Sequence, residues 1–229
     1  MIAVAPTDTP PRYADHHDAG RVLARALGSL TGAADVVVLG LPRGGVPVAW
    51  EVAHAIGAPL DVFVTSRMTL PDHPDLSFGV VASGGIRIVD RELVAGLGLS
   101  APTVNAVTRA AAADLARHER TYREGGRPLA IGNRVVVLVS DAMTSGTAMR
   151  AAVLAVRTLR PRRVIVASPV GCASACDELR ALADEVICPR VVVTRRGVAA
   201  AYADPAETRD DEVRALLGLA RQAGGQVGR

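Results

Sequence analysis

Short runs rich in β-branched residues alternate with longer helix-forming stretches along the 229-residue chain. The runs lie at residues 35–40, 60–65, 134–140, 162–168 and 184–193. Continuous apolar runs of this kind are typical of strands buried on both faces of a parallel sheet. Helices are expected between them, one ending at Gly57 and another before Pro161. Such strand–helix–strand units form right-handed crossovers, so the pattern predicts an α/β fold with a doubly wound parallel sheet.

The interval from about residue 66 to residue 130 interrupts this alternation. It contains two short extended pieces around residues 83–85 and a long arginine-rich helix-forming stretch over residues 102–126. We interpret the interval as an insertion between the second and third core strands, forming a flexible arm over the site. The length of the chain suits one domain, so residues 1–229 are expected to form a single domain that carries this arm.

All 26 cationic residues are arginine, because the chain contains no lysine. This excludes chemistry that depends on a lysine side chain, including Schiff-base catalysis, Ser-Lys hydrolysis and a P-loop with its GK[ST] signature. Aromatic residues make up 3% of the chain, too few for the stacking surface of a single-strand nucleic-acid reader. Since 23 acidic residues leave a net charge of only +3, no nucleic-acid partner is expected.

The three cysteines, Cys172, Cys176 and Cys188, lack a disulfide spacing, which fits a reducing cytosol. Cys172 and Cys176 could share a helical face, but no further ligands complete a metal site, so buried thiols are favoured. The N-terminal residues are not expected to form a signal peptide, because their apolar run is too short and they are too acidic, and no apolar window approaches about 18 residues. We therefore expect a cytoplasmic protein without a membrane partner.

The first candidate ligand-binding turn follows the run at residues 35–40 and reads GLPRGG (residues 40–45). In open α/β sheets, ligands bind beyond the carboxyl ends of the strands. Adjacent glycines that enter a helix bring backbone N–H groups close to an anion, and Arg43 adds a forked donor for phosphate oxygens. A glycine pair in such a turn is also common for structural reasons alone.

The second candidate turn follows the run at residues 134–140, where the strand ends at Asp141. The loop that follows holds three hydroxyl side chains and a glycine before a helix begins. Hydroxyls, free N–H groups and the helix dipole form a phosphate cradle, while Asp141 can bind sugar hydroxyls or hold a water on Mg²⁺. An ordinary N-cap accounts for Thr144 or Ser145 alone, but not for the carboxylate together with a second anion-binding turn.

At these two motifs the sequence resembles the type I phosphoribosyltransferases. It is most similar to a bacterial group of predicted phosphoribosyltransferases whose first turn reads LPRGGVPVA, as at residues 41–49 here. The resemblance extends from about Arg21 to Leu217. It implies a parallel α/β core with a small hood, which binds 5-phosphoribosyl 1-diphosphate with Mg²⁺ and displaces pyrophosphate with a nitrogenous base. It also implies a role in nucleotide metabolism and a homodimer formed through the arm.

The resemblance assigns roles by position. Asp141 is the second of two paired acids that face the ribose, and it holds Mg²⁺ directly or through water; Ser140 stands at the first acid. Tyr202 is the remaining aromatic candidate near the base. The pyrophosphate-binding set comprises Arg43, Gly44, Gly45 and Arg67. The loop for the 5′-phosphate comprises Thr144, Ser145, Gly146, Thr147 and Ala148.

The chain departs from the family pattern at these positions. Where the family loop reads DDxxATGAT, residues 140–148 read SDAMTSGTA, so that Ser140 replaces the first acid. Arg67 replaces a lysine, and residues 199–202 replace an aromatic cluster. A carboxylate missing beneath an oxocarbenium-like ribose removes several kcal/mol of stabilisation. The sequence therefore leaves open a transferase with weakened catalysis, a non-catalytic regulatory protein that binds phosphoribosyl diphosphate or a nucleotide, and a phosphohydrolase.

Several histidines are assigned to ordinary structural positions. Residues 15–18 (DHHD) have the side-chain types of metal ligands, but neighbours on a helix point apart, so a solvated N-terminal turn is expected. His73 and His118 of the arm are expected at the surface, and Trp50 is expected in packing.

Overall fold

A five-stranded parallel sheet forms the centre of the computed structural model, which describes residues 12–70, 72–123, 128–204 and 207–226. The strand order is β2-β1-β6-β7-β9. The strands are β1 (Val36–Gly40), β2 (Leu60–Val62), β6 (Val135–Val139), β7 (Arg163–Ala167) and β9 (Glu185–Ile187). The predicted α/β class with a parallel sheet is confirmed.

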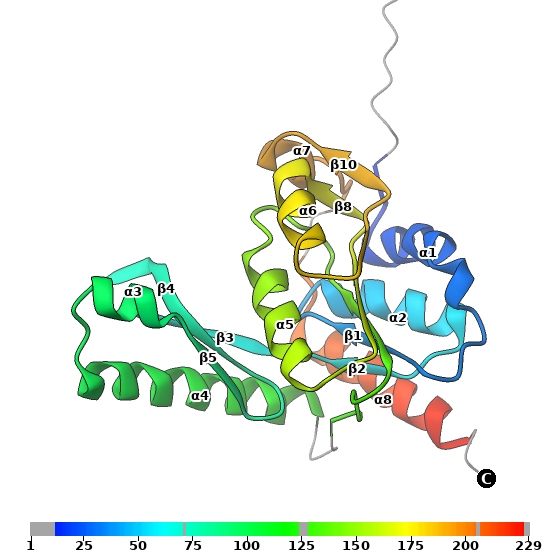
Figure 1. Ribbon diagram of the computed structural model, residues 1–229. Coiled ribbons are helices and arrows are strands. Elements are labelled where there is room, and N and C mark those ends of the chain that lie inside the picture. Colours follow the sequence, from blue (N-terminus) through cyan, green and yellow to red (C-terminus); the bar gives the residue numbers. More distant parts are fainter. Residues whose placement is uncertain (1–11, 71, 124–127, 205–206, 227–229) are drawn as a thin grey trace, which may run out of the picture.

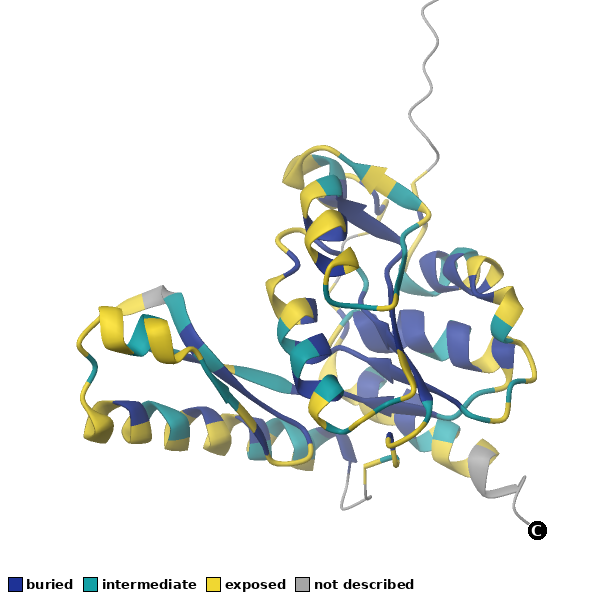
Figure 2. Ribbon diagram, in the orientation of Figure 1, coloured by how far each residue is buried: buried dark blue, intermediate teal, exposed yellow. Residues whose placement is uncertain are grey.

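Helices cover both faces of this sheet, as Figures 1 and 2 show. Alternate strand residues point to opposite faces, so that Val38 and Val137 pack in one hydrophobic cluster and Leu39 and Leu138 in the other. The first cluster is shared with α1 (His16–Ala26), α2 (Gly45–Ile56) and α8 (Asp210–Gln226), and the second with α5 (Thr147–Thr158) and α6 (Ala173–Arg180). A short 3₁₀ turn, η1 (Gly28–Leu30), follows α1.

A small hood stands above the carboxyl ends of the strands. It contains a two-stranded parallel sheet, and its elements besides α6 are β8 (Val170–Cys172), β10 (Arg190–Val192) and α7 (Arg195–Ala199). The prediction of one strand over residues 184–193 is wrong, because the run divides at Pro189 between β9 in the core and β10 in the hood. Proline has no N–H group to donate to a ladder, which interrupts the pairing at this point.

The interval between β2 and β6 forms an arm that projects from the core (Figure 1). Its three-stranded antiparallel sheet has the order β3-β4-β5. The elements are β3 (Thr65–Leu70), β4 (His73–Ala82), β5 (Ile86–Val89), α3 (Arg91–Gly96) and α4 (Ala101–Arg123). Within the predicted interval of 66–130, residues 71 and 124–127 lie outside the described residues. The strand predicted over residues 60–65 is shorter in the structure. Strand β2 ends at Val62, and Thr65 is the first residue of β3 in the arm.

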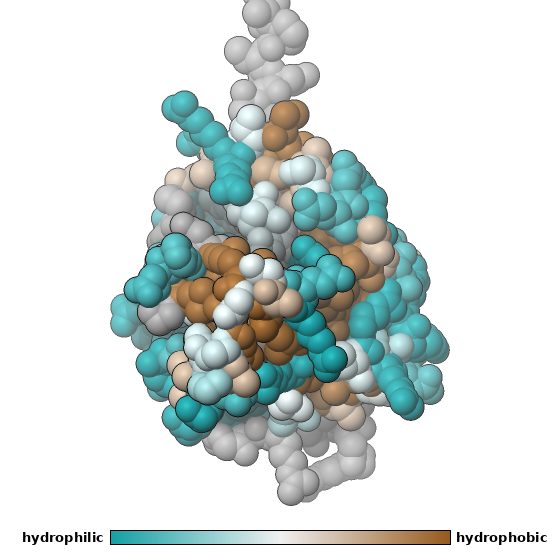
Figure 3. Space-filling model, turned by 60° about the vertical axis from the view of Figure 1, so that its left-hand side comes forward, coloured by the Kyte–Doolittle hydropathy of each residue, from teal (hydrophilic) through white to brown (hydrophobic). Residues whose placement is uncertain are grey.

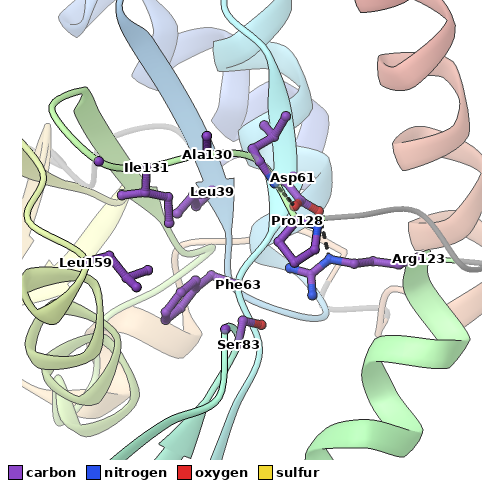
Figure 4. Close-up of a pocket in the computed structure, with 12 residues that line it drawn as sticks. Leu39, Asp61, Phe63, Ser83, Arg123, Pro128, Ala130, Ile131 and Leu159 are labelled. Carbon is purple, nitrogen blue, oxygen red and sulfur yellow. Dashed lines mark hydrogen bonds and ion pairs between the residues drawn. The ribbon is translucent and has the colours of Figure 1, made fainter.

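A buried ion pair anchors the arm to the core (Figure 4). Arg123, the last residue of α4, places Nε 3.3 Å from Oδ1 of Asp61 in β2, and each residue is only 6% exposed. The same guanidinium donates to the carbonyl of Val62 at 2.7 Å, and Asp61 accepts a further bond from the N–H of Leu129 at 3.1 Å. Apolar side chains that include Phe63 surround the adjoining cavity of about 320 Å³. These bonds fix the point where the arm leaves the core.

Candidate functional site

The chain changes direction across the sheet at β1. From β1 it passes to β2 on one side, and after the arm it continues at β6 on the other side. The crevice beyond the carboxyl ends of the strands at such a switch point is the usual place for a ligand in open α/β sheets. Both predicted turns lie here, and the N–H of Leu41 after β1 donates to the carbonyl of Val139 at the end of β6 at 2.8 Å.

The glycine pair after β1 is required by the close approach of the two turns. A Cβ on Gly44 would lie 2.7 Å from Oδ2 of Asp141, and a Cβ on Gly45 would lie 2.8 Å from the carbonyl oxygen of Val139. The peptide between Pro42 and Arg43 is cis. Helix α2 begins at Gly45 without a side-chain cap among the described residues, so its first N–H groups face this turn.

The loop after β6 surrounds a hollow of about 140 Å³, lined by Leu41, Pro42 and residues 140–149. Three hydroxyl-bearing residues of this loop are exposed: Thr144, Ser145 and Thr147. Gly146 adopts φ 68° directly before α5, a left-handed conformation that glycine enters without a steric cost. Since no side chain in the described part of the chain caps α5, its first N–H groups and the hydroxyls together can bind an anion.

The hood braces this loop through Met143. The N–H of Met143 donates to the carbonyl of Val170 at 3.0 Å, and its carbonyl accepts from the N–H of Cys172 at 2.8 Å. Met143 itself is buried. The loop conformation thus depends on strand β8 as well as on its own sequence.

Ser140 and Asp141, the two positions of the predicted ribose motif, differ in their surroundings. Ser140 is 7% exposed, and its hydroxyl donates to the carbonyl of Ala142 at 3.3 Å. The carboxyl group of Asp141 keeps 41% of its side-chain surface open. The surrounding protein shields the rest of the group from solvent, and this burial raises the pKa of Asp141, while the neighbouring His16 acts in the opposite direction.

A second hollow of about 290 Å³ adjoins the first and shares Pro42 and Asp141 with it. Its lining is polar and comprises His16, Pro42, Arg43, Gly44, Asp141, Glu207 and Thr208. Arg43 is 55% exposed at its side chain and pairs with Glu207 at 3.4 Å. The two hollows adjoin at Pro42 and Asp141 and together form the candidate site.

The expectation of a solvated turn at residues 15–18 is wrong for His16. Its side chain is 17% exposed, Nδ1 lies 3.1 Å from the hydroxyl of Thr208, and Nε2 lies 3.8 Å from Oδ2 of Asp141. His17 points elsewhere, toward Glu51 at 2.8 Å. The two histidines do point apart as expected, but α1 docks so that one of them faces the site. The sequence around His16, Glu207 and Thr208 carries no local signal that places these residues in the second hollow.

Tyr202 supports Asp141 through a hydrogen bond to its backbone. Its hydroxyl donates to the carbonyl of Asp141 at 2.7 Å, and its ring lies 5.1 Å from that of His16 and 5.6 Å from that of Tyr13. Burial and the nearby Asp141 raise the pKa of Tyr202. Because Tyr202 is only 8% exposed, the ring packs inside the protein in this structure rather than presenting an open face.

The remaining predicted residues lie outside the two hollows. Arg67 is exposed on β3, opposite Val80 in the arm. Cys172 and Cys176 are buried and Cys188 is half-buried, and no group of three or more metal-binding side chains occurs among the described residues. No helix within that part of the chain is long and apolar enough to cross a membrane.

The chain resembles several known proteins. Residues 12–203 match the family described as the phosphoribosyl transferase domain. Two curated proteins of Mycobacterium tuberculosis, from strains CDC 1551 and H37Rv, are provisionally named phosphoribosyl transferases and are each 37% identical over 216 residues. The match covers 94% of this chain and 48% of theirs, so the chain spans about half the length of these relatives. The crystal structure of TT1426 from Thermus thermophilus is 36% identical with a TM-score of 0.80, covering 90% of this chain and 98% of that one.

Proposed function

The chain belongs to the phosphoribosyl transferase family, and from this premise we propose that it is a Mg²⁺-dependent phosphoribosyltransferase. Its substrates in this proposal are 5-phosphoribosyl 1-diphosphate and a nitrogenous base. The observation that carries the proposal is the meeting of two anion-binding turns at Asp141, at the switch point of the sheet. A substrate with a phosphate at one end and a diphosphate at the other matches this pair of hollows.

The loop after β6 holds the 5′-phosphate in this proposal. The exposed hydroxyls of Thr144, Ser145 and Thr147 and the uncapped start of α5 supply donors, with Gly146 and Ala148 completing the loop. The turn after β1 holds the diphosphate through Arg43 and the N–H groups at Gly44 and Gly45. Arg67, which is exposed on β3, also contacts the diphosphate in this proposal.

Mg²⁺ fits the oxygen donors of the second hollow. Asp141 offers an accessible carboxylate, and Glu207 borders the same space. Mg²⁺ is typically held by one or two carboxylates together with substrate phosphates and waters, so a cluster of protein ligands is not required. In this proposal Asp141 would hold the ion directly or through water, and the ion would supply positive charge against the diphosphate.

In the proposed reaction the residues of the chain act mainly by positioning the substrate. The base nitrogen forms a bond to C1 of the ribose while the bond from C1 to the diphosphate breaks, and the diphosphate leaves with the electron pair. Where the attacking nitrogen carries a hydrogen, that proton passes to water. The two turns hold the phosphates at either end, and the negative charge of Asp141 favours the cation-like ribose between them. Ser140 supplies no second charge, so we propose that catalysis is weaker than two acids would allow.

The buried Ser140 favours a second candidate function. Its hydroxyl is bonded within the loop to Ala142, and no carboxylate stands at this position. Phosphate binding by backbone N–H groups is independent of that carboxylate. A non-catalytic regulatory protein that binds phosphoribosyl diphosphate or a nucleotide is therefore the alternative.

Calorimetry with phosphoribosyl diphosphate, with and without Mg²⁺, tests both functions together. We expect binding that strengthens when Mg²⁺ is present, and absence of binding in both conditions contradicts both. Pyrophosphate release with a panel of bases then separates enzyme from regulator. Ser140→Asp sharpens the distinction: turnover gained by the variant supports the regulator, whereas little gain or a loss supports an enzyme adapted to serine.

We also propose a homo-oligomer in the cytoplasm. Figure 3 shows hydrophobic surface at the centre of the face seen from the arm side, and Leu97 of the arm is 40% exposed. Exposed apolar surface of this kind often marks an interface. Light scattering coupled to size-exclusion chromatography tests this, and a monomer at micromolar concentration contradicts it.

A further inference from the structure

His16 and Asp141 face each other across the second hollow without a direct hydrogen bond. Nε2 of His16 lies 3.8 Å from Oδ2 of Asp141. Hydrogen bonds between nitrogen and oxygen span about 2.7–3.2 Å, so this separation is too long for one. A polar atom that sits beside the two groups can instead contact both of them.

Both groups are held in place before any ligand arrives. The hydroxyl of Thr208, which is only 4% exposed, lies 3.1 Å from Nδ1 of His16, and the ring of Tyr202 packs on the imidazole. When the Thr208 hydroxyl donates to Nδ1, Nε2 carries a hydrogen and becomes a donor toward the hollow. Asp141 is fixed by the bond from Tyr202 to its carbonyl and by its contact with Gly44.

We propose that His16 and Asp141 together bind one hydroxyl group of the ribose. Asp141 accepts the hydrogen of that hydroxyl, and Nε2 of His16 donates to its oxygen. A hydroxyl is both donor and acceptor, so it matches the pair, whereas an ionised phosphate oxygen has no hydrogen to give and is repelled by the carboxylate. The inference rests on the proposed function and adds to it a sugar contact from helix α1.

The position of the pair agrees with this assignment. The two hollows share Pro42 and Asp141, so a sugar whose 5′-phosphate occupies the loop after β6 reaches the second hollow directly. Ser140, at the position of the missing acid, uses its hydroxyl within the loop. His16 therefore supplies a second polar contact to the ribose that residue 140 does not.

Calorimetry with three sugar phosphates tests the pair: ribose 5-phosphate, 2-deoxyribose 5-phosphate and 3-deoxyribose 5-phosphate. A site built to bond a hydroxyl rejects the analogue without it, because its polar groups are left unpaired. We expect the wild type to bind ribose 5-phosphate at least about tenfold more tightly than one of the deoxy sugars. His16→Ala should reduce that preference to within about threefold, and His16→Gln, which retains an N–H donor, should keep part of it.

His17→Ala is the matched control, because His17 neighbours His16 on α1 but contacts Glu51 and Glu212 instead. It should retain the wild-type preference. Thr208→Val gives a second route if His16→Ala does not fold, since it removes the partner of Nδ1 and should weaken the same preference. Thermal unfolding, followed through the fluorescence of Trp50, checks each variant.

The results separate the inference from the proposed function. If the wild type binds phosphoribosyl diphosphate and prefers ribose 5-phosphate, but His16→Ala and Thr208→Val keep the full preference, the inference is wrong and the function stands. A wild type that binds all three sugars equally also overturns the inference alone. A wild type that binds neither phosphoribosyl diphosphate nor ribose 5-phosphate overturns both.

Discussion

Gly44 and Asp141 lie in contact across the two turns, and a Cβ at position 44 would stand 2.7 Å from Oδ2 of the carboxylate. The φ of Gly44 is −61°, so alanine fits the backbone and its cost comes from this contact alone. The position of Asp141 therefore depends on the absence of a side chain in the opposite turn.

Gly44→Ala should displace Asp141 and lower the affinity for phosphoribosyl diphosphate by about tenfold or more, since misplacement by about 1 Å is costly at such sites. Calorimetry measures the affinity, and thermal unfolding should change little. Gly28→Ala is the matched control, because a Cβ there meets no atom within 4 Å. Equal affinity in both variants would show that the contact does not position the carboxylate.

Tyr202→Phe should weaken the site through the backbone of Asp141. The variant loses the 2.7 Å bond to the Asp141 carbonyl but keeps the ring between Tyr13 and His16. We expect a stability loss of about 1 kcal/mol in denaturant unfolding, together with weaker binding of phosphoribosyl diphosphate. Tyr13→Phe loses a comparable bond, from Tyr13 to the carbonyl of Pro169 at 3.0 Å, and should lose stability without the same loss of binding. If both variants bind alike, Tyr202 serves packing only.

Without Mg²⁺ in the buffer, Glu207→Gln should increase the affinity for inorganic pyrophosphate. Glu207, 87% exposed at its side chain, pairs with Arg43 at 3.4 Å, so an anion must compete with it for the guanidinium. Exposed ion pairs contribute at most about 1 kcal/mol, which limits the gain to about fivefold, and added salt should reduce it. Calorimetry at two salt concentrations measures the effect. Glu185→Gln, which releases Arg163 on a strand of the core, should leave the affinity unchanged.

The sequence predicts the two turns because each depends on local signals. The GLPRGG turn and the loop around Asp141 each follow a β-branched run directly, and parallel strands place their carboxyl ends at one edge. The arm was also predictable, since residues 66–130 break the alternation of strands and helices. Pro189 is also a local signal, because a proline interrupts strand pairing, and it predicts the division of residues 184–193 into two strands.

The contacts around Asp141 from distant segments could not be predicted in this way. His16 and Thr208 are 192 positions apart, and they meet only because α1 and the segment before α8 pack on the same end of the sheet. Tyr202 likewise takes its place through a bridge to Tyr13. The resemblance to the family places Tyr202 near the base, but it does not predict this bridge or the burial of the ring.

Asp184 should make the stability of the core depend on pH in the acid range. Burial favours the neutral acid, but the N–H of Val164 at 2.7 Å and the guanidinium of Arg157 at 3.0 Å outweigh it and hold the pKa of Asp184 below its ordinary value. The stabilising contribution of the Asp184 carboxylate is fully present above about pH 4, the pKa of an unfolded aspartate. It is lost as the pH falls through the pKa of Asp184 in the folded protein. Because the side chain is 38% exposed, the contribution stays below about 1 kcal/mol. Denaturant unfolding should separate Asp184→Asn from wild type more widely at pH 7 than at pH 3, and an equal difference at both contradicts this.

The buried pair of Asp61 and Arg123 should dominate the attachment of the arm. Arg123→Met leaves the carboxylate of Asp61 buried without its cation, so this variant should lose about 3–5 kcal/mol. Asp61→Asn should lose less, because the guanidinium keeps its second ion pair, with Glu119 on α4. Denaturant unfolding measures the losses. Asp177→Asn, which breaks the exposed pair with Arg180, should cost less than about 1 kcal/mol.

The double variant Asp61→Asn with Arg123→Met should lose clearly less than the sum of the single losses, because the carboxylate of Asp61 is then no longer left buried without its cation. Hydrogen exchange shows whether the loss is local: with the anchor removed, the N–H groups of the arm strands should exchange faster, while β1 and β6 remain protected. Additive losses in the double variant would mean that the two charges act independently. In that case the bonds to Val62 and Leu129, rather than the ion pair, hold the arm to the core.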